Sequence, residues 1–199
     1  MRIAPRRLLC LALLAPAGLS AQARYSASLG LLGGTPLAHD QVFQEIDVQQ
    51  DLAPTVTLGV SFPVSKREYF GLETALGFSG VTIVESGSPD VMGPSFTTLS
   101  LTGSVDGPVI GPLRYRVGAG ILKYLPDKEG IFAEGGPLLL VLTAGADVRL
   151  VTRGSFTLMA RVRYDYQRFT TDQLQFSGFS RTQDVHRLGL GLGVDYSRP

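Results

Sequence analysis

The sequence contains little cysteine and histidine, and it contains no tryptophan. Its one cysteine, Cys10, lies in an apolar N-terminal stretch, so the rest of the chain forms no disulfide and no cysteine-ligated metal site. The two histidines, His39 and His186, are far apart and build no cluster with metal-ligand spacing. Glycine is spread through the chain rather than gathered into a phosphate-binding loop. We therefore expect no cofactor and no metal.

The sequence also has no apolar run of the roughly 20 residues that a spanning helix needs. The apolar stretch from Leu8 to Leu14 follows three arginines and precedes small residues that end at Ala23. This pattern predicts a secretory signal peptide over residues 1–23. Its cleavage removes three of the 18 basic residues and none of the 17 acidic ones, which leaves residues 24–199 with a net charge of −2. No basic surface for nucleic acid is expected.

Eight segments of the chain alternate apolar residues with polar or very small ones. In the segment from Phe156 to Tyr166, apolar or aromatic residues take every second position, and Arg161, Arg163 and Asp165 lie between them. A period of two predicts a β-strand with one apolar and one polar face. The predicted strands cover residues 24–37, 53–65, 69–83, 96–106, 113–125, 137–151, 155–170 and 182–197.

The connections between these strands alternate in length. Those after the second, fourth and sixth strands are short, at residues 66–68, 107–112 and 152–154, and Gly154 suits the left-handed position of a hairpin turn. The other connections are longer and acidic. Bacterial outer-membrane barrels have short periplasmic turns and longer external loops. An even number of strands then places both ends of the barrel on the periplasmic side.

Alternation does not show which face points inward, so a soluble barrel with an apolar lumen is the first alternative. A soluble barrel needs a hydrated outer wall rich in charged residues. The chain has only three lysines, Lys66, Lys123 and Lys128, all at or near connections. Composition therefore favours an apolar outer wall that faces lipid and a polar lumen.

The polar phase contains carboxylates and arginines, and a buried charge is costly unless it is paired. Arginine binds a carboxylate through two parallel hydrogen bonds, so we expect these residues to pair and to plug the narrow lumen. If Phe156 lies opposite Tyr196, Asp165 faces Arg187 and two lumen arginines face glycines. The predicted lumen network consists of Glu73, Asp106, Arg114, Arg116, Asp147, Arg149, Arg161, Arg163, Asp165, Arg187 and Asp195.

Aromatic residues of the apolar phase gather at one end of the predicted strands, the end with the short connections. Such residues favour the interface between membrane and water, where barrels carry aromatic girdles. The predicted periplasmic-side girdle consists of Tyr25, Phe62, Phe70, Tyr115, Phe156 and Tyr196.

The last strand alternates Leu188, Leu190, Leu192 and Val194 and finishes at Tyr196. With the strand and loop pattern, this resembles the small eight-stranded bacterial outer-membrane barrels of the OmpX and OmpA-barrel type. The resemblance implies an all-β fold, an eight-stranded antiparallel up-and-down transmembrane β-barrel over residues 24–199. It also implies a position in the outer membrane and recognition of the last strand by the outer-membrane assembly machinery. Three residues follow Tyr196, whereas the aromatic residue usually ends the chain.

We expect a structural or surface-interaction role, with a surface glycolipid or a protein as partner at the long loops. The first loop contains Val42, Phe43, Ile46 and Val48, which favour a hairpin that extends beyond the membrane. Divalent cations that bridge the acidic loops to glycolipid phosphates are a further hypothesis. Two other functions stay open: a lipid-modifying barrel enzyme and a soluble periplasmic lipocalin-like binder. Neither histidine lies in a recognised nucleophile and base pattern, so we expect no enzyme.

Overall fold

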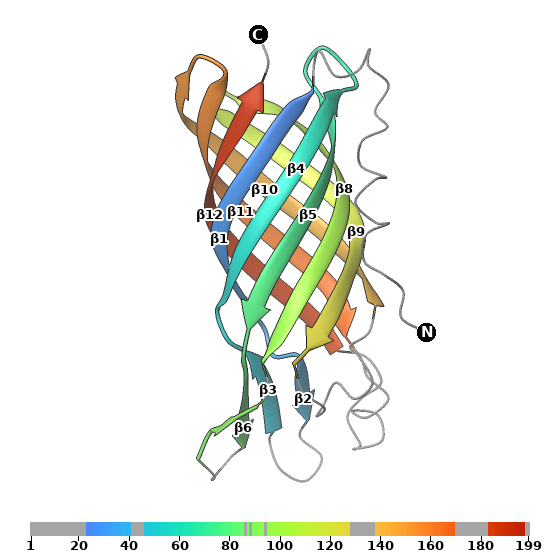
Figure 1. Cartoon of the computed structure of the whole chain (residues 1–199). Coiled ribbons are helices and arrows are strands. Elements are labelled where there is room, and N and C mark those ends of the chain that lie inside the picture. Colours follow the sequence, from blue (N-terminus) through green and yellow to red (C-terminus); the bar gives the residue numbers. More distant parts are fainter. Residues whose placement is uncertain are drawn as a thin grey trace, which may run out of the picture.

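Eight long strands close into an antiparallel barrel in the computed structural model of the protein (Figure 1). The model describes residues 23–40, 46–85, 87, 89–93, 95–127, 138–169 and 183–197, and the predicted signal peptide lies almost entirely outside these ranges. The barrel strands are β1 (Arg24–Gly34), β4 (Ala53–Pro63), β5 (Tyr69–Ser79), β8 (Phe96–Ile110), β9 (Leu113–Pro126), β10 (Leu138–Arg153), β11 (Phe156–Phe169) and β12 (Gln183–Ser197). Each pairs with the next barrel strand along the chain, and β12 closes onto β1. The predicted fold is confirmed.

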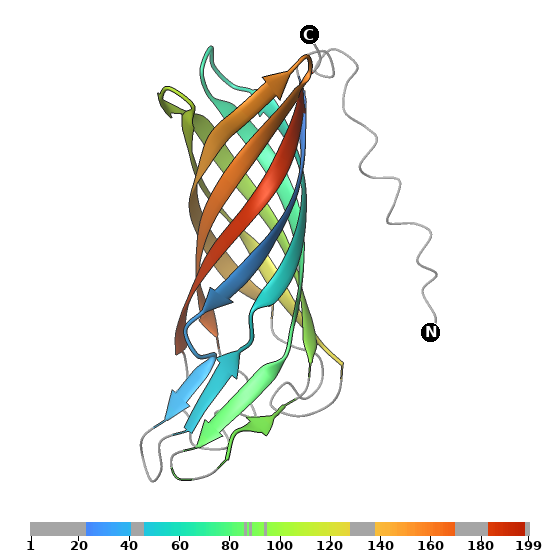
Figure 2. The same ribbon diagram turned by 90° about the vertical axis from the view of Figure 1, so that its left-hand side faces the viewer.

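The barrel has two unlike ends (Figures 1 and 2). Arg24 pairs with Ser197, so the first and last strands begin and end at the same rim as the short turns. We call this rim the turn end and the opposite rim the loop end. Gly111 and Gly154 occupy two of the short turns with φ of 54° and 60°, a left-handed conformation that glycine adopts without strain. The predicted conformation of Gly154 is confirmed.

The apolar phase of the strands faces outward. Leu190 on β12 is 61% exposed, and leucines and valines on every barrel strand are exposed in the same way. On β5 exposed and buried residues alternate along most of the strand, with Glu73 buried between exposed neighbours. A soluble lipocalin-like barrel requires the reverse arrangement, so the structure contradicts that alternative. No helix long and apolar enough to cross a membrane occurs in the described ranges.

The register of the last hairpin confirms the predicted alignment. Phe156 lies opposite Tyr196, and Asp165 lies opposite Arg187. The same register sets Arg161 and Arg163 of β11 against glycines of β12. Because side chains alternate along a strand, this alignment fixes which residues of the two strands share a face, and the burial of Asp165 and Arg187 shows that theirs points into the lumen.

A second sheet lies beyond the loop end of the barrel (Figure 2). It consists of β2 (Ala38–Asp40), β3 (Ile46–Gln50), β6 (Val81–Glu85) and β7 (Val91–Met92), in the order β2, β3, β6, β7. The predicted extension of the first loop is confirmed for the part that contains Ile46 and Val48, whereas Val42 and Phe43 lie outside the described residues.

The structure corrects three predicted boundaries. The segments 24–37 and 69–83 were each predicted as one strand, but β1 ends at Gly34 and β5 ends at Ser79. The chain then leaves the barrel, and Ala38–Asp40 and Val81–Glu85 pair in the loop-end sheet. The connection predicted at 107–112 is only Gly111–Pro112. A register shift next to Pro108 accommodates a residue that has no N–H for the ladder.

Candidate functional site

The turn end of the lumen is organised around one buried carboxylate, Asp106 on β8. It accepts hydrogen bonds from Arg24 Nη2 at 2.6 and 2.7 Å and a further one from Arg114 Nη2. Both guanidinium groups also lie over the ring of Tyr69, at 4.5 and 5.6 Å from its centroid. An aromatic face attracts cations, so Tyr69 and Asp106 together hold two arginines at this end.

The middle of the lumen contains alternating positive and negative groups. Arg116 donates to Glu73 through Nη1 and to Asp147 through Nη2, the latter at 2.8 Å. Arg161 donates to Asp195 through Nη2 at 2.7 Å, and its Nε lies 3.8 Å from Asp147. These side chains are all largely buried. Each of these carboxylates therefore meets an arginine from a different strand, and the pair of Glu73 with Arg116 reaches past β8 to join β5 to β9.

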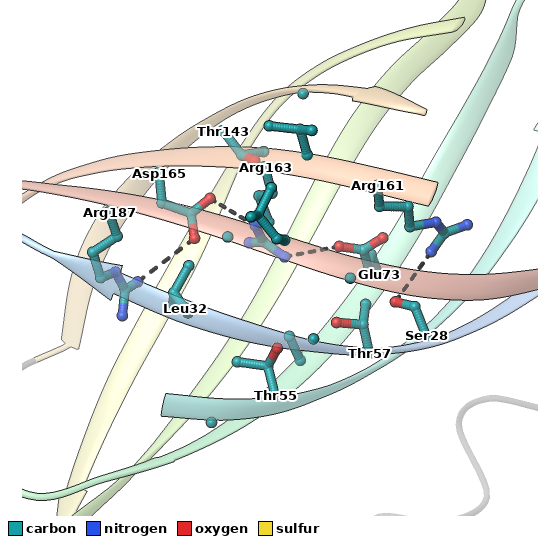
Figure 3. Close-up of a pocket in the computed structure, with 18 of the residues that line it drawn as sticks. Ser28, Leu32, Thr55, Thr57, Glu73, Thr143, Arg161, Arg163, Asp165 and Arg187 are labelled. Atoms are coloured by element: carbon teal, nitrogen blue, oxygen red, sulfur yellow. Dashed lines mark hydrogen bonds and ion pairs between the residues drawn. The ribbon is translucent and has the colours of Figure 1, made fainter. Parts of the chain in front are cut away.

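The loop-ward part of the network is less completely paired (Figure 3). Arg163 donates to Glu73 through Nη1 at 2.9 Å and to Asp165 through Nε at 2.7 Å. Arg187 Nη2 lies 3.7 Å from Asp165 Oδ2 and donates to Gln167 Oε1 at 3.3 Å. A separation of 3.7 Å is an ion pair without a good hydrogen bond. Asp165 therefore binds Arg163 much more closely than Arg187.

The structure brings ten of the eleven predicted network residues together, and it also adds two that were not predicted. Arg149 is the exception: it is exposed near the turn end of β10, and no ion pair joins it to the described residues. Arg149 keeps the inward register, opposite the buried Met159, and the register shift follows it. Its side chain is exposed because it lies near the turn-end rim, close to the end of β10 at Arg153. The prediction for Arg149 was wrong. Arg24 and Tyr69 were missed, although both occupy the inward phase of their strands.

Glycines on β12 make room for the long arginine side chains. A Cβ atom at Gly193 would lie 3.1 Å from Arg161 Nε, and one at Gly191 would lie 2.6 Å from the backbone oxygen of Leu29. Contacts this short require a shift of the neighbouring atoms. The absence of a side chain at Gly193 therefore leaves room for Arg161 to extend over β12 toward Asp195 and Ser28.

A cavity of about 80 Å³ lies between the middle and loop-ward parts of the network. This is room for a few water molecules or one small ion. Arginines and carboxylates of the network border it, together with hydroxyl side chains from β1, β4, β8 and β10. The hydroxyl residues are Ser28, Thr55, Thr57, Thr98, Ser100 and Thr143.

An apolar layer, not a charged one, fills the lumen at the loop end. The ring of Tyr124 packs between Phe96 and Phe169, with centroids 5.3 and 5.2 Å away, and its hydroxyl accepts a hydrogen bond from Gln167. The layer joins inward residues of the barrel to residues of the loop-end sheet. Its buried members are Leu37, Ala38, Val48, Val81, Phe96, Leu122, Tyr124, Val141, Phe169 and Val185.

The six predicted girdle residues all lie near the turn end on the outward phase. They form the facing pairs Tyr25–Tyr196, Phe156–Tyr196 and Phe62–Phe70, with Tyr115 on β9. The rings of Phe156 and Tyr196 are 5.1 Å apart. The hydroxyl of Tyr115 donates to Glu68 at 3.3 Å, so this ring has a polar end toward the turns. A ring with one polar and one apolar end suits a membrane interface.

Both histidines lie at the loop end, in different settings. His39 Nδ1 is 2.5 Å from Asp47 Oδ1 in the loop-end sheet. His186 faces outward on β12, where its Nδ1 is 2.6 Å from the Tyr164 hydroxyl and its ring lies 5.3 Å from that of Tyr166. Among the described residues, no group of three histidine, cysteine or acidic side chains is placed to hold a metal ion.

Comparison with known proteins finds likeness in structure alone. No family model matches the sequence, and no curated protein sequence matches it. Neisserial surface protein A (NspA) matches 87% of this chain and 96% of its own, with a TM-score of 0.56 and 12% identity. The outer membrane protein AlkL, solved in lipid bilayers, matches 88% of this chain and 90% of its own, with a TM-score of 0.54 and 15% identity.

The fold is that of the small eight-stranded outer-membrane barrels. The outer wall agrees with that conclusion, because exposed leucines and valines surround the barrel between its two rims. A lipid-facing apolar band with an aromatic girdle is the arrangement that the outer membrane requires of such barrels. The protein is an integral outer-membrane β-barrel.

Proposed function

We propose that the protein is a sealed membrane anchor that holds its loop-end sheet outside the cell for contact with a surface partner. The observation that carries this proposal is the sheet itself, because its residues share one packed layer with the inner wall of the barrel. A partner bound to the sheet is thereby held rigidly at the membrane surface.

Hydrogen bonds also fasten the loop-end sheet to the barrel rim. Asp51, between β3 and β4, donates its backbone N–H to the Gly80 carbonyl at 3.1 Å and accepts from the Ser79 hydroxyl at 2.8 Å. Its side chain accepts from the Thr82 hydroxyl at 2.9 Å. Hydrogen bonds therefore hold together the two segments that connect the barrel to the loop-end sheet, one before β4 and one after β5.

The free edges of the loop-end sheet favour a protein partner over a purely structural role. Within the described residues β7 pairs only with β6, and Met92 on β7 is 92% exposed. An unpaired strand edge is a surface on which another chain adds a strand through backbone hydrogen bonds. We propose no catalytic role for the protein.

The lumen is expected to conduct no ions. The arginine and carboxylate network fills its turn-ward and middle parts, and the apolar layer around Tyr124 fills its loop end. Protein inserted into planar bilayers is expected to give no stable current above the background, while a general porin inserted in the same way gives one. A large and reproducible single-channel conductance would show that the lumen is open.

The orientation follows from the two unlike ends of the barrel. An epitope tag inserted after Asp90, beside the edge strand β7, is expected to bind antibody on intact cells. A tag appended after Pro199 is expected to bind only after the outer membrane is permeabilised, because the chain ends at the turn end. Surface labelling of the tag after Pro199 would contradict the proposed orientation.

Mass spectrometry of the same purified protein tests whether residues 1–23 have been removed.

A further inference from the structure

The two ends of the barrel carry opposite charge outside the lumen network. Among the described residues, the exposed charges of the turn end are the cations Lys66, Arg67, Arg149 and Arg153 and the carboxylate Glu68. The loop end has the reverse balance, and its exposed charges are those of Asp51, Asp90, Asp127, Asp184 and Arg168. The turn end is therefore a cationic surface, although the barrel as a whole is not basic.

Arg153 lies on the outer face of the barrel, level with the aromatic girdle. It ends β10 and lies opposite Phe156 across the hairpin between β10 and β11. Residues directly opposite each other on paired strands point to the same side of the sheet. Phe156 is a girdle residue that faces outward, and its ring packs 5.1 Å from that of Tyr196. Arg153 is therefore at the height at which girdle rings meet the membrane interface.

Arg149 shares the strand and the rim with Arg153 but faces the other way. It lies opposite Met159, which is buried inside the barrel. Its side chain therefore extends from the mouth of the lumen, whereas that of Arg153 extends from the wall that faces lipid. The two arginines separate an effect on the lumen mouth from an effect on the surrounding membrane.

Lys66 and Arg67 lie on the opposite side of the turn-end rim, in the turn between β4 and β5 (Figure 1). In the closed sheet, two barrel strands separate this turn from the hairpin between β10 and β11 in either direction. A small ligand on one side of the rim cannot touch both turns, but a lipid leaflet surrounds the whole barrel.

The charges of these three cations are not neutralised within the described residues. Lys66, Arg67 and Arg153 form no ion pair there. The neighbouring carboxylate of Glu68 accepts hydrogen bonds from the hydroxyls of Tyr115 at 3.3 Å and Ser65 at 3.4 Å instead. Arginine binds a phosphate group through two parallel hydrogen bonds, and lysine binds it as a point charge.

We propose that Arg153, Lys66 and Arg67 bind the phosphate groups of anionic phospholipids in the leaflet at the turn end. A headgroup of the phosphatidylglycerol type suits these cations, because a zwitterionic headgroup carries its own cation beside the phosphate. The assignment of this leaflet to the periplasmic side rests on the orientation proposed above. The binding itself does not, so it is tested in vesicles whose two leaflets contain the same lipids.

Spin-labelled lipids measure the preference directly. Protein extracted from outer membranes is refolded into phosphatidylcholine vesicles with a trace of spin-labelled phosphatidylglycerol or phosphatidylcholine that have the same chains. Electron spin resonance gives the fraction of each lipid immobilised on the barrel. The association constant of phosphatidylglycerol is expected to exceed that of phosphatidylcholine by up to about fivefold at low salt, the effect of one cation near an anionic headgroup. The preference is expected to vanish at about 1 M salt, where the Debye length is only about 3 Å.

Variants locate the binding residues. Replacement of Lys66, Arg67 and Arg153 together by glutamine is expected to abolish the preference, while Arg149→Gln, the matched control, is expected to keep it. A preference that persists in the triple variant, or that disappears in Arg149→Gln, overturns the proposal. Equal retention of the two lipids by the parent protein at low salt also overturns it, even if the triple variant fails to fold.

Discussion

Replacement of Asp165 by leucine is expected to destabilise the barrel by about 3–5 kcal/mol, the effect typical of removing one partner from a buried ion pair. Asp165 is 2% exposed and contacts both Arg163 and Arg187. Its loss leaves the loop-ward part of the network with two arginines and no carboxylate of their own. The shape of leucine is close to that of aspartate, so most of the effect is electrostatic.

The change in stability is measured as the free energy of unfolding in urea, with the protein folded into lipid vesicles. Asp184→Leu is the matched control, because the same substitution there breaks an ion pair between the same two strands. The pair of Asp184 with Arg168 is exposed at the loop end, so its loss is expected to change stability little. Equal effects of the two substitutions would show that the lumen around Asp165 is wet and that its charges are screened.

The fold was predictable from the sequence because strand alternation and loop lengths are local features. The faces were assigned correctly because an outer wall with almost no lysine does not suit water, and the structure places Leu190 outward as that argument requires. The register of β11 and β12 followed from one assumed pair, Phe156 and Tyr196, because both aromatic residues had been assigned to the same rim and the same outward phase.

Alternation predicts which side chains face the lumen but not how deep in it they lie. Arg149 keeps the inward phase, opposite Met159, and was misplaced because it lies near the turn-end rim, where its side chain is exposed. Arg24 was missed because it follows directly on the predicted signal peptide, although Ser26 and Ser28 share its phase. Whether each of these arginines joins the lumen network depends on whether a carboxylate lies within reach, and that carboxylate comes from a strand distant in sequence.

The apolar layer at the loop end is the largest feature that the sequence analysis missed. Its signal is visible in the segments 121–125 and 138–142, where both phases of the strand are mostly apolar. A purely lipid-facing strand has a polar inner phase, so two apolar phases indicate a strand buried on both sides. Leu122, Tyr124 and Val141 have this character, and they meet residues of β3 and β6 that no local pattern could place beside them.

Replacement of Leu190 by arginine is expected to destabilise the barrel by about 2–4 kcal/mol, the effect of a cation near the midplane of a bilayer. Leu190 lies at the centre of β12 (Gln183–Ser197) and points outward with 61% of its surface exposed. An arginine there places its guanidinium against the hydrocarbon, and from the middle of the strand the side chain is far from either rim.

The depth of the new charge, rather than the substitution itself, is expected to set the size of the effect. Val109→Arg is the control, because Val109 is similarly exposed but lies beside the short turn between β8 and β9. Near an interface the same charge costs only about 0–1 kcal/mol. Both variants are folded into vesicles and unfolded in urea beside the parent protein. If Leu190→Arg proved harmless while Arg163→Leu did not, the outer wall would face water and the assignment to the membrane would be wrong.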